Sequence, residues 1–158
     1  HHAKVLGTAY RITGNLGDAE DALQTVFLRL LDRGVAGEPV GKLDGYLHRA
    51  AVNAALDVLR RRKHVLALAD APPRSLEDSR PSPDRCREAS EIRAFLREAL
   101  GQLSPRAAEV FVLHYVEGYS GGDIARMIGA SRATVAVVLH RTRSRLKKQI
   151  RSHFGGIV

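Results

Sequence analysis

Basic side chains gather in two places along this chain, and their types and spacing could bind the phosphates of a nucleic acid. The first group is the run RRRK at positions 60–63. The second follows helical spacing and consists of Arg141, Arg143, Arg145, Lys147, Lys148 and Arg151. Neutralising phosphates releases counterions and gives affinity that is independent of base sequence. The formal net charge of +8 agrees with a polyanionic partner, and the alternative is a basic surface that serves solubility alone.

A second candidate surface lies on a helix predicted over residues 43–62. The side chains that share one face of it are Tyr46, Arg49, Asn53, Asp57 and Arg60. An aromatic ring stacks on bases, a guanidinium binds phosphate and an amide bonds base edges, so this face could hold single-stranded nucleic acid. The alternative is a solvated face on which Asp57 pairs with Arg60 or Arg61. The buried side is predicted to consist of Leu47, Ala50, Ala51, Ala54, Ala55 and Val58.

The stretch RATVAVVLHRTRSRL, residues 132–146, predicts a helix with an apolar first half and a basic second half. At about 100° per residue, its buried side consists of Val135, Val138, Leu139, Thr142 and Leu146. Its opposite side consists of Ala133, Val137, His140, Arg141, Ser144 and Lys148. Within the segment 136–138, only Val137 therefore lies on a face that could read DNA. Valine or alanine can contact a thymine methyl group, and the side chains left for bases and phosphates are Arg132, Thr134, His140 and Arg141.

The residues before this helix predict a helix-turn-helix, which makes a helix lying on a membrane surface the weaker alternative. The signals for helix starts and ends are Ser104 with Pro105, Gly118, Ser120 with Asp123, Gly129 and Ser131. Ala125 is small where the two helices would touch, and Gly129 supplies the turn. The side chains predicted to face inward are Ile124, Ile128, Val135 and Val138.

Nearer the start of the chain, a helix is predicted to begin at an Asp18 N-cap and to stop at Gly34. Its core stripe consists of Ala19, Ala22, Leu23, Val26, Phe27, Leu30 and Leu31. Leu28 falls on the other side, among Asp21, Gln24 and Asp32. That side is either a docking face for another protein or a solvated face with one stray leucine.

The fold class predicted from these patterns is all-α, with two small helical domains joined by a Pro-rich linker. The domains are expected at residues 1–63 and 91–158, and the linker at 64–90, where Pro72, Pro73, Pro81 and Pro83 occur among Ser and acidic residues. The single Cys86 cannot form an internal disulfide, and no apolar run approaches the roughly 20 residues that span a bilayer. We therefore expect a cytoplasmic protein.

No catalytic site is expected. The seven His are scattered without a metal-ligand pattern, no Gly-rich phosphate loop precedes a helix, and no pair of acids is placed for acid–base work. The sequence thus predicts a binding protein that is not an enzyme and that needs no cofactor or metal.

Both halves of the chain resemble the sigma-seventy family in its small extracytoplasmic-function (ECF) group. The segments AYRITGNLGDAEDALQTVFLRLL and LDGYLHRAAVNAALDVLRRRK are similar to region two, and LSPRAAEVFVLHYVEGYSGGDIARMIGASRATVAVVLHRTRSRLKK is similar to region four. The two regions occur in the family's order and cover nearly the whole chain outside the linker. The chain begins inside the first helix of region two, so we expect an N-terminally truncated region.

The resemblance implies roles for individual residues. Binding to the β′ clamp helices of core RNA polymerase is implied for Asp18, Asp21, Gln24, Leu28 and Asp32. Melting and holding the minus-ten promoter element is implied for Tyr46, Arg49, Asn53, Arg60 and Arg61, with the loop 34–42 in the place that captures a flipped base. Reading of the minus-35 element is implied for Arg132, Ala133, Thr134, Val137, His140 and Arg141, while the second domain sits on the β flap and the linker threads toward the active-site cleft.

The function implied is that of a sigma factor, which binds core polymerase and promoter DNA and could be held by an anti-sigma factor. Two departures stand out: Tyr46 replaces a common Trp, and Ala136, Val137 and Val138 replace the Lys, Ser and Arg common in relatives. The second departure motivates one alternative, a sigma-like decoy that binds an anti-sigma factor without reading DNA. The other alternative is a LuxR-like helix-turn-helix regulator, which the LSPRAAEVF stretch also resembles.

Overall fold

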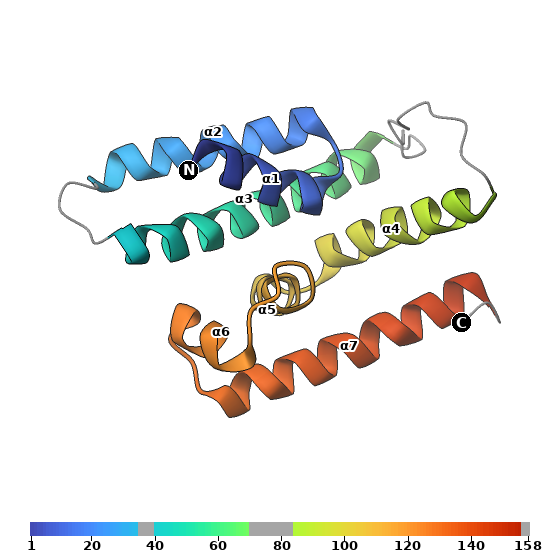
Figure 1. The fold of residues 1–158 in the computed structure, drawn as a ribbon. Coiled ribbons are helices and arrows are strands. Elements are labelled where there is room, and N and C mark those ends of the chain that lie inside the picture. The colour runs from blue at the N-terminus through green and yellow to red at the C-terminus, as the bar shows by residue number, and fades with distance from the viewer. Residues whose placement is uncertain (35–39, 70–83, 156–158) are drawn as a thin grey trace.

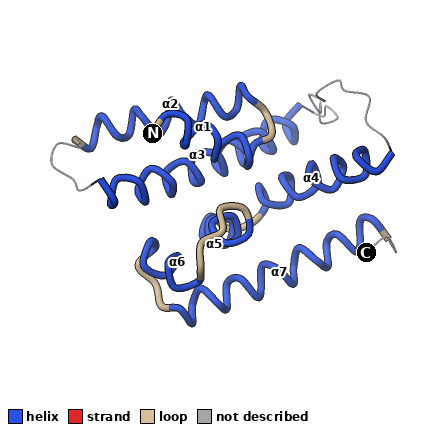
Figure 2. The backbone as a smooth tube through the Cα atoms, in the orientation of Figure 1, coloured by secondary structure: helices blue, strands red, loops and turns tan. Residues whose placement is uncertain are grey.

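The computed structural model describes residues 1–34, 40–69 and 84–155, and within these ranges every regular element is an α-helix (Figure 2). The helices are α1 His2–Thr13, α2 Leu16–Arg33, α3 Val40–Ala69, α4 Asp84–Gln102, α5 Pro105–Tyr115, α6 Gly121–Ile128 and α7 Arg132–Phe154. The predicted all-α fold class is confirmed. No helix among the described residues is long and apolar enough to cross a membrane.

Helices α1, α2 and α3 pack on one another and form the first module (Figure 1). Small side chains let their backbones approach closely, and the fully buried alanines are Ala9, Ala19, Ala22, Ala51 and Ala55. The last turn of α2 extends beyond this core. Leu31, in this last turn, is 77% exposed, whereas Phe27, one turn earlier, stacks on His2 of α1. The prediction that Leu31 belongs to the core stripe is therefore wrong.

The second module is built from α5, α6 and α7, with α4 leading into it (Figure 1). Its central apolar residues, Val110, Val112, Leu113, Ile124 and Val135, are fully buried. At the far end of α7, Phe154 and His153 pack against Phe95 of α4. Helix α7 is thus supported by α5 and α6 along its first half and by α4 at its end.

Most of the predicted helix starts are found. The hydroxyls of Ser104, Ser120 and Ser131 accept hydrogen bonds from the backbone N–H groups three residues later, and Gly129 ends α6 in the left-handed conformation at φ 69°. The N-cap of α2 is Asn15 and not Asp18, because the Asn15 side chain accepts the hydrogen bond of the Asp18 N–H at 3.0 Å. Gly118 lies in the turn after α5, which ends three residues earlier.

The helices reach further into the expected linker than predicted. Helix α3 continues to Ala69 and α4 begins at Asp84, so residues 64–69 and 84–90 are helical. Proline is excluded from helix interiors, and the first and last prolines of this segment are Pro72 and Pro83. Both helices accordingly extend close to these prolines.

The two modules pack against each other through α3, which contacts both α4 and α5. As a result α3 is buried beyond its predicted buried side, and Val52, Leu56 and Leu59 are at most 5% exposed. Close approach is possible where α4 passes α3, because Gly101 has no side chain and its Cβ position lies 3.4 Å from the Leu59 carbonyl oxygen. The packing of the second module on α3 decides which of the predicted site residues are accessible.

Candidate nucleic-acid interface

The helix-turn-helix presents one open face of α7. Arg132, Ala133, Thr134, Val137, His140 and Arg141 are all exposed. On the opposite side of α7, Val135, Thr142 and Leu146 are at most 4% exposed, and Val138 and Leu139 are partly buried against the core. The predicted division of this helix is confirmed. Val137 is 48% exposed and gives the open face an apolar centre next to the basic residues.

The start of α7 is fixed by local contacts. The Ser131 hydroxyl accepts from the Thr134 N–H at 3.1 Å and lies 2.8 Å from the Thr134 hydroxyl. The Arg132 guanidinium lies against Gly122 at the start of α6, where a Cβ would come within 2.8 Å of an Arg132 nitrogen. Glycine at this position leaves room for this placement of Arg132.

The polar stripe predicted on α3 consists of Tyr46, Arg49, Asn53, Asp57 and Arg60, and it is less open to solvent than the exposed face of α7. Arg49 donates from Nε to the Glu109 carboxylate on α5 and from Nη1 to the Met127 carbonyl oxygen at 3.1 Å. Asn53 donates from Nδ2 to the same Glu109 oxygen at 3.3 Å. Met127 lies in the last turn of α6, where a cation is favoured by the helix dipole. Two of the predicted DNA-binding residues are therefore engaged by the second module.

A second carboxylate, that of Glu117, is held by the first module. Arg11 of α1 donates to both of its oxygens, at 3.1 and 2.9 Å, and His48 Nε2 lies 2.7 Å from Oε2. The Thr8 hydroxyl lies 3.5 Å from the same oxygen. The Glu117 side chain is only 2% exposed. Burial alone would raise its pKa, but the hydrogen bonds and charges of Arg11 and His48 outweigh burial and hold the pKa of Glu117 below its ordinary value.

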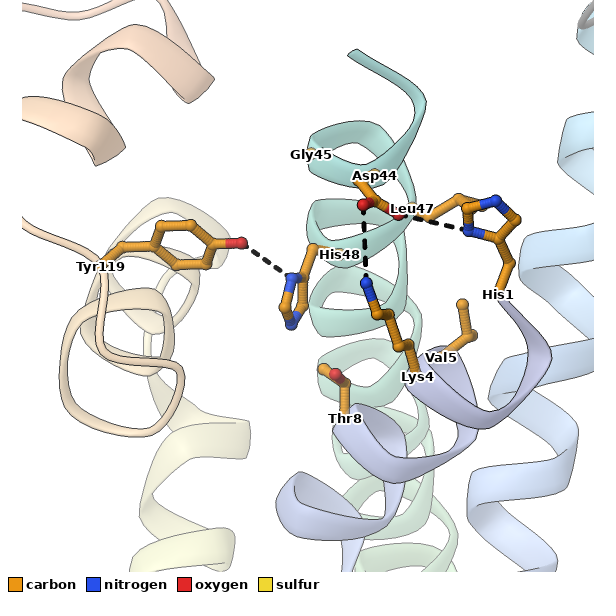
Figure 3. Close-up of a pocket in the computed structure, with 9 residues that line it drawn as sticks. All are labelled: His1, Lys4, Val5, Thr8, Asp44, Gly45, Leu47, His48 and Tyr119. Atoms are coloured by element: carbon orange, nitrogen blue, oxygen red, sulfur yellow. Dashed lines mark hydrogen bonds and ion pairs between the residues drawn. The ribbon is translucent and has the colours of Figure 1, made fainter. Parts of the chain in front are cut away.

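The contact continues to Tyr119, in the loop between α5 and α6, whose hydroxyl lies 2.7 Å from His48 Nδ1 (Figure 3). Burial and the nearby carboxylates of Glu117, Asp44 and Asp123 raise the pKa of Tyr119. Tyr119 and His48 line a cavity of about 380 Å³ together with residues of α1. Figure 3 shows how these lining residues lie. On its other side, Asp44 pairs with His1 at 3.2 Å and Lys4 at 3.5 Å.

The remaining α3 residues lie around these contacts. The Arg33 guanidinium lies over the Tyr46 ring, 4.6 Å from its centroid. Arg60 donates to Asp57 at 2.8 Å, which is the pairing named above as the alternative for this face. Its Nε and Nη2 atoms are buried with no hydrogen-bond acceptor in the described part of the chain. Arg61 is exposed.

The expected docking face on α2 is solvent-exposed. Asp21, Gln24, Leu28 and Asp32 are exposed, with Leu28 at 57%, and Leu31 adds a second large apolar side chain to this side of the helix. Asp18 lies apart from them, because its carboxylate pairs with Arg62 of α3 at 3.2 Å. The face therefore combines acidic groups with an apolar pair.

Sequence reasoning missed Glu109 and Glu117, together with their partners Arg11 and His48. A signal for Glu109 was present, since it is a single acid inside the apolar run AAEVFVL of α5. A buried carboxylate requires a partner. The sequence contained no corresponding signal for which partner would meet it, because the contact joins positions 60 residues apart.

Comparisons with known proteins agree with this architecture. Residues 1–65 match the family described as Sigma-70 region 2, and residues 96–146 match Sigma-70, region 4. The chain is 34% identical over 154 residues to the RNA polymerase sigma factor CarQ of Myxococcus xanthus, a match that covers 94% of this chain and 83% of CarQ. It is 35% identical over 156 residues to the ECF RNA polymerase sigma factor SigE of Mycolicibacterium smegmatis. The chain belongs to the ECF sigma factors of the sigma-70 family.

The match to SigE covers 97% of this ECF chain and 60% of SigE, so the chain spans less than two thirds of that relative. Among solved structures, its fold is similar to that of the sigma factor RpoE from Bartonella quintana, in a co-crystal structure with the anti-sigma factor NepR. The TM-score is 0.50 at 19% identity, and the match covers 95% of this chain and 91% of RpoE. The predicted resemblance is confirmed for both halves of the chain and in the predicted order.

Proposed function

We propose that this ECF chain directs core RNA polymerase to promoters, with α7 reading the minus-35 element and α3 holding the melted minus-ten element. The observation that carries the proposal is the open, basic face of α7 on a helix-turn-helix, in a chain whose two halves match sigma regions two and four. This role takes place in the cytoplasm. It depends on binding to core polymerase and promoter DNA and needs no catalytic residue.

The open face of α7 is suited to the major groove. Arg132 and Arg141 supply cations for phosphates or guanine, and Thr134 and His140 supply hydrogen-bonding groups. Val137, at the centre of this face, contacts a thymine methyl group in place of a polar base contact. We therefore propose a minus-35 preference that differs from that of relatives with polar residues at this position.

The exposed side of α2 is proposed as the surface for the β′ clamp helices. Leu28 and Leu31 are 57% and 77% exposed, and exposed apolar pairs among polar groups are typical of protein-binding surfaces. Asp21, Gln24 and Asp32 surround them on the same helix. The second module is proposed to sit on the β flap.

An anti-sigma factor is proposed as a further partner, since the similar RpoE was crystallised with one. A decoy that has lost DNA reading is less well supported, because the basic residues of α7 remain exposed. A LuxR-like regulator would account for the helix-turn-helix but not for residues 1–65, which match region 2.

Reconstituted transcription tests the proposal. Core polymerase from the source organism is combined with the chain and genomic promoter fragments, and transcript starts are mapped. We expect new start sites that depend on the chain, and loss of these starts with Leu28→Asp. A chain that neither binds core polymerase nor supports any start site would contradict the proposed function, and binding to an anti-sigma domain without transcription would favour the decoy.

A further inference from the structure

The interface between the modules uses the same side chains that the proposed function assigns to single-stranded DNA. Arg49 and Asn53 both bind the Glu109 carboxylate, and Arg49 also binds the Met127 carbonyl oxygen. In this arrangement α5 and the end of α6 lie on the stripe. DNA cannot contact Arg49 and Asn53 while α5 and α6 occupy these side chains.

The two carboxylates depend on the first module for their hydrogen bonds. Glu109 is 5% exposed, and its side-chain partners among the described residues are Arg49 and Asn53. Glu117 has a 2% exposed side chain, and Arg11, His48 and Thr8 surround it. Buried carboxylates are costly without partners. The closed arrangement therefore satisfies both acids, and separation of the modules would leave both to be hydrated.

In a third polar contact, α4 supplies the hydrogen-bond donor and the first module supplies the acceptor. Arg97 of α4 donates from Nε to the Ile12 carbonyl oxygen at 3.2 Å, at the C-terminal end of α1. Gly14 makes room for it, because a side chain at position 14 would overlap the Arg97 guanidinium. Contacts donated by both modules specify one closed arrangement.

The chemistry of Glu109 resembles that of the proposed ligand. A carboxylate that accepts hydrogen bonds from a guanidinium and an amide occupies these donors as a nucleic-acid phosphate would.

We propose that Glu109 and Glu117 hold the free chain closed, with Glu109 as an internal substitute for phosphate on Arg49 and Asn53. The closed interface and single-stranded DNA then exclude each other, and polymerase must open the chain before α3 can hold DNA. This inference rests on the proposed function of the α3 stripe.

The test uses the full chain with two neutral variants and a charge-matched control. Glu109→Gln removes the carboxylate from Arg49, and Glu117→Gln weakens the interface without touching Arg49. Glu98→Gln, at an exposed position of α4, removes the same charge outside these contacts. Energy transfer between dyes on Glu20→Cys in α2 and Ser152→Cys in α7, in a Cys86→Ser background, reports separation of the modules. Fluorescence anisotropy measures binding of a labelled single-stranded DNA of mixed sequence, without polymerase.

We expect lower energy transfer for Glu109→Gln and Glu117→Gln than for Glu98→Gln. The affinity for DNA should rise as the modules separate, by about tenfold if the open form is about one tenth of the free chain. Because Glu117 does not contact Arg49, a higher DNA affinity of Glu117→Gln reports opening of the interface and not a local change at Arg49. Circular dichroism checks that each variant keeps its helices, and Glu117→Gln serves as the test if Glu109→Gln loses them.

Unchanged energy transfer in both variants would overturn the inference and leave the proposed function in place. Opening without a gain in DNA affinity over Glu98→Gln would overturn the competition and the assignment of α3 to DNA together. Failure of the chain to bind core polymerase, with opening and DNA binding as expected, would overturn the proposed function alone.

Discussion

At the scale of single residues, Glu117 shows how one side chain joins two helices to the loop between α5 and α6. Its carboxylate accepts from Arg11 on α1 and His48 on α3, and His48 in turn meets the hydroxyl of Tyr119. His48 donates from Nε2 to the ionised acid, and its Nδ1 can accept from Tyr119 when the ring is neutral or donate when it is protonated. The cluster is therefore satisfied in either charge state of the histidine.

The lowered pKa of Glu117 predicts a dependence of stability on acid. A lowered carboxyl pKa contributes stability that is present above the unfolded-state pKa of about 4.3 and is lost as the pH falls through the folded-state value. Glu117→Gln should lower the free energy of unfolding by about 1–3 kcal/mol at pH 7, and this difference should shrink below about pH 4.5. Urea denaturation followed by circular dichroism between pH 7 and pH 3 measures it.

The groups that face the Glu117 carboxylate are Arg11, His48 and the Thr8 hydroxyl, and Tyr119 contacts His48. Glu98→Gln is the control, because Glu98 is exposed on α4. A Glu117→Gln difference that stays constant over the whole pH range would show that the ionised carboxylate does not stabilise the fold.

At the scale of elements, α7 combines a supported side with an open one. Val135, Thr142 and Leu146 bury one side, while the other side carries Val137 and Arg141 to solvent. Contacts at both ends hold the helix, through the Ser131 cap and through Phe154 against Phe95. A helix held in this way presents its open side without a large loss of conformational freedom on binding.

Arg141→Ala should weaken binding of duplex DNA across all sequences and reduce the dependence of log affinity on log salt by about one unit of slope. The reason is that a phosphate contact releases about one counterion. Titrations of promoter and random duplexes at several salt concentrations measure both effects. Arg93→Ala, an exposed position on α4, is the control and should change the slope less. An unchanged slope for Arg141→Ala would show that this side chain does not contact phosphate.

At the scale of the whole molecule, two small modules share one interface through α3. Modules of this size bury a modest fraction of their surface and are marginally stable alone. The interface buries Val52, Leu56 and Leu59 on additional sides of α3 and ties both modules through Glu109, Glu117 and Arg97. Each module is therefore stabilised by the other in the closed form.

This coupling predicts a single thermal unfolding transition for the chain. Loss of the interface in the double variant Glu109→Gln/Glu117→Gln should separate the melting of the two modules into two transitions, the lower one below that of the unaltered chain. Differential scanning calorimetry resolves the transitions, and the Glu98→Gln variant should keep one. Two transitions in the unaltered chain would contradict the coupling.

Local patterns predicted most of the helices and one of the surfaces. Ser104, Ser120 and Ser131 cap helices as expected, because a cap depends on a residue and the three that follow it. The two sides of α7 follow from helical periodicity. Periodicity failed at Leu31, which it assigns to the core stripe of α2 but which is 77% exposed, because burial depends on contact with a neighbouring helix and not on spacing alone.

The sequence by itself determined an all-helical chain with a helix-turn-helix, a basic α7 and a polar stripe on α3, since these depend on spacing within single helices. Only the tertiary structure decided that Arg49 and Asn53 of this stripe meet Glu109 and that Glu117 is buried against Arg11. These contacts join residues between 56 and 106 positions apart. Helical periodicity carries no information on such pairs, because the packing of one module on the other brings them together.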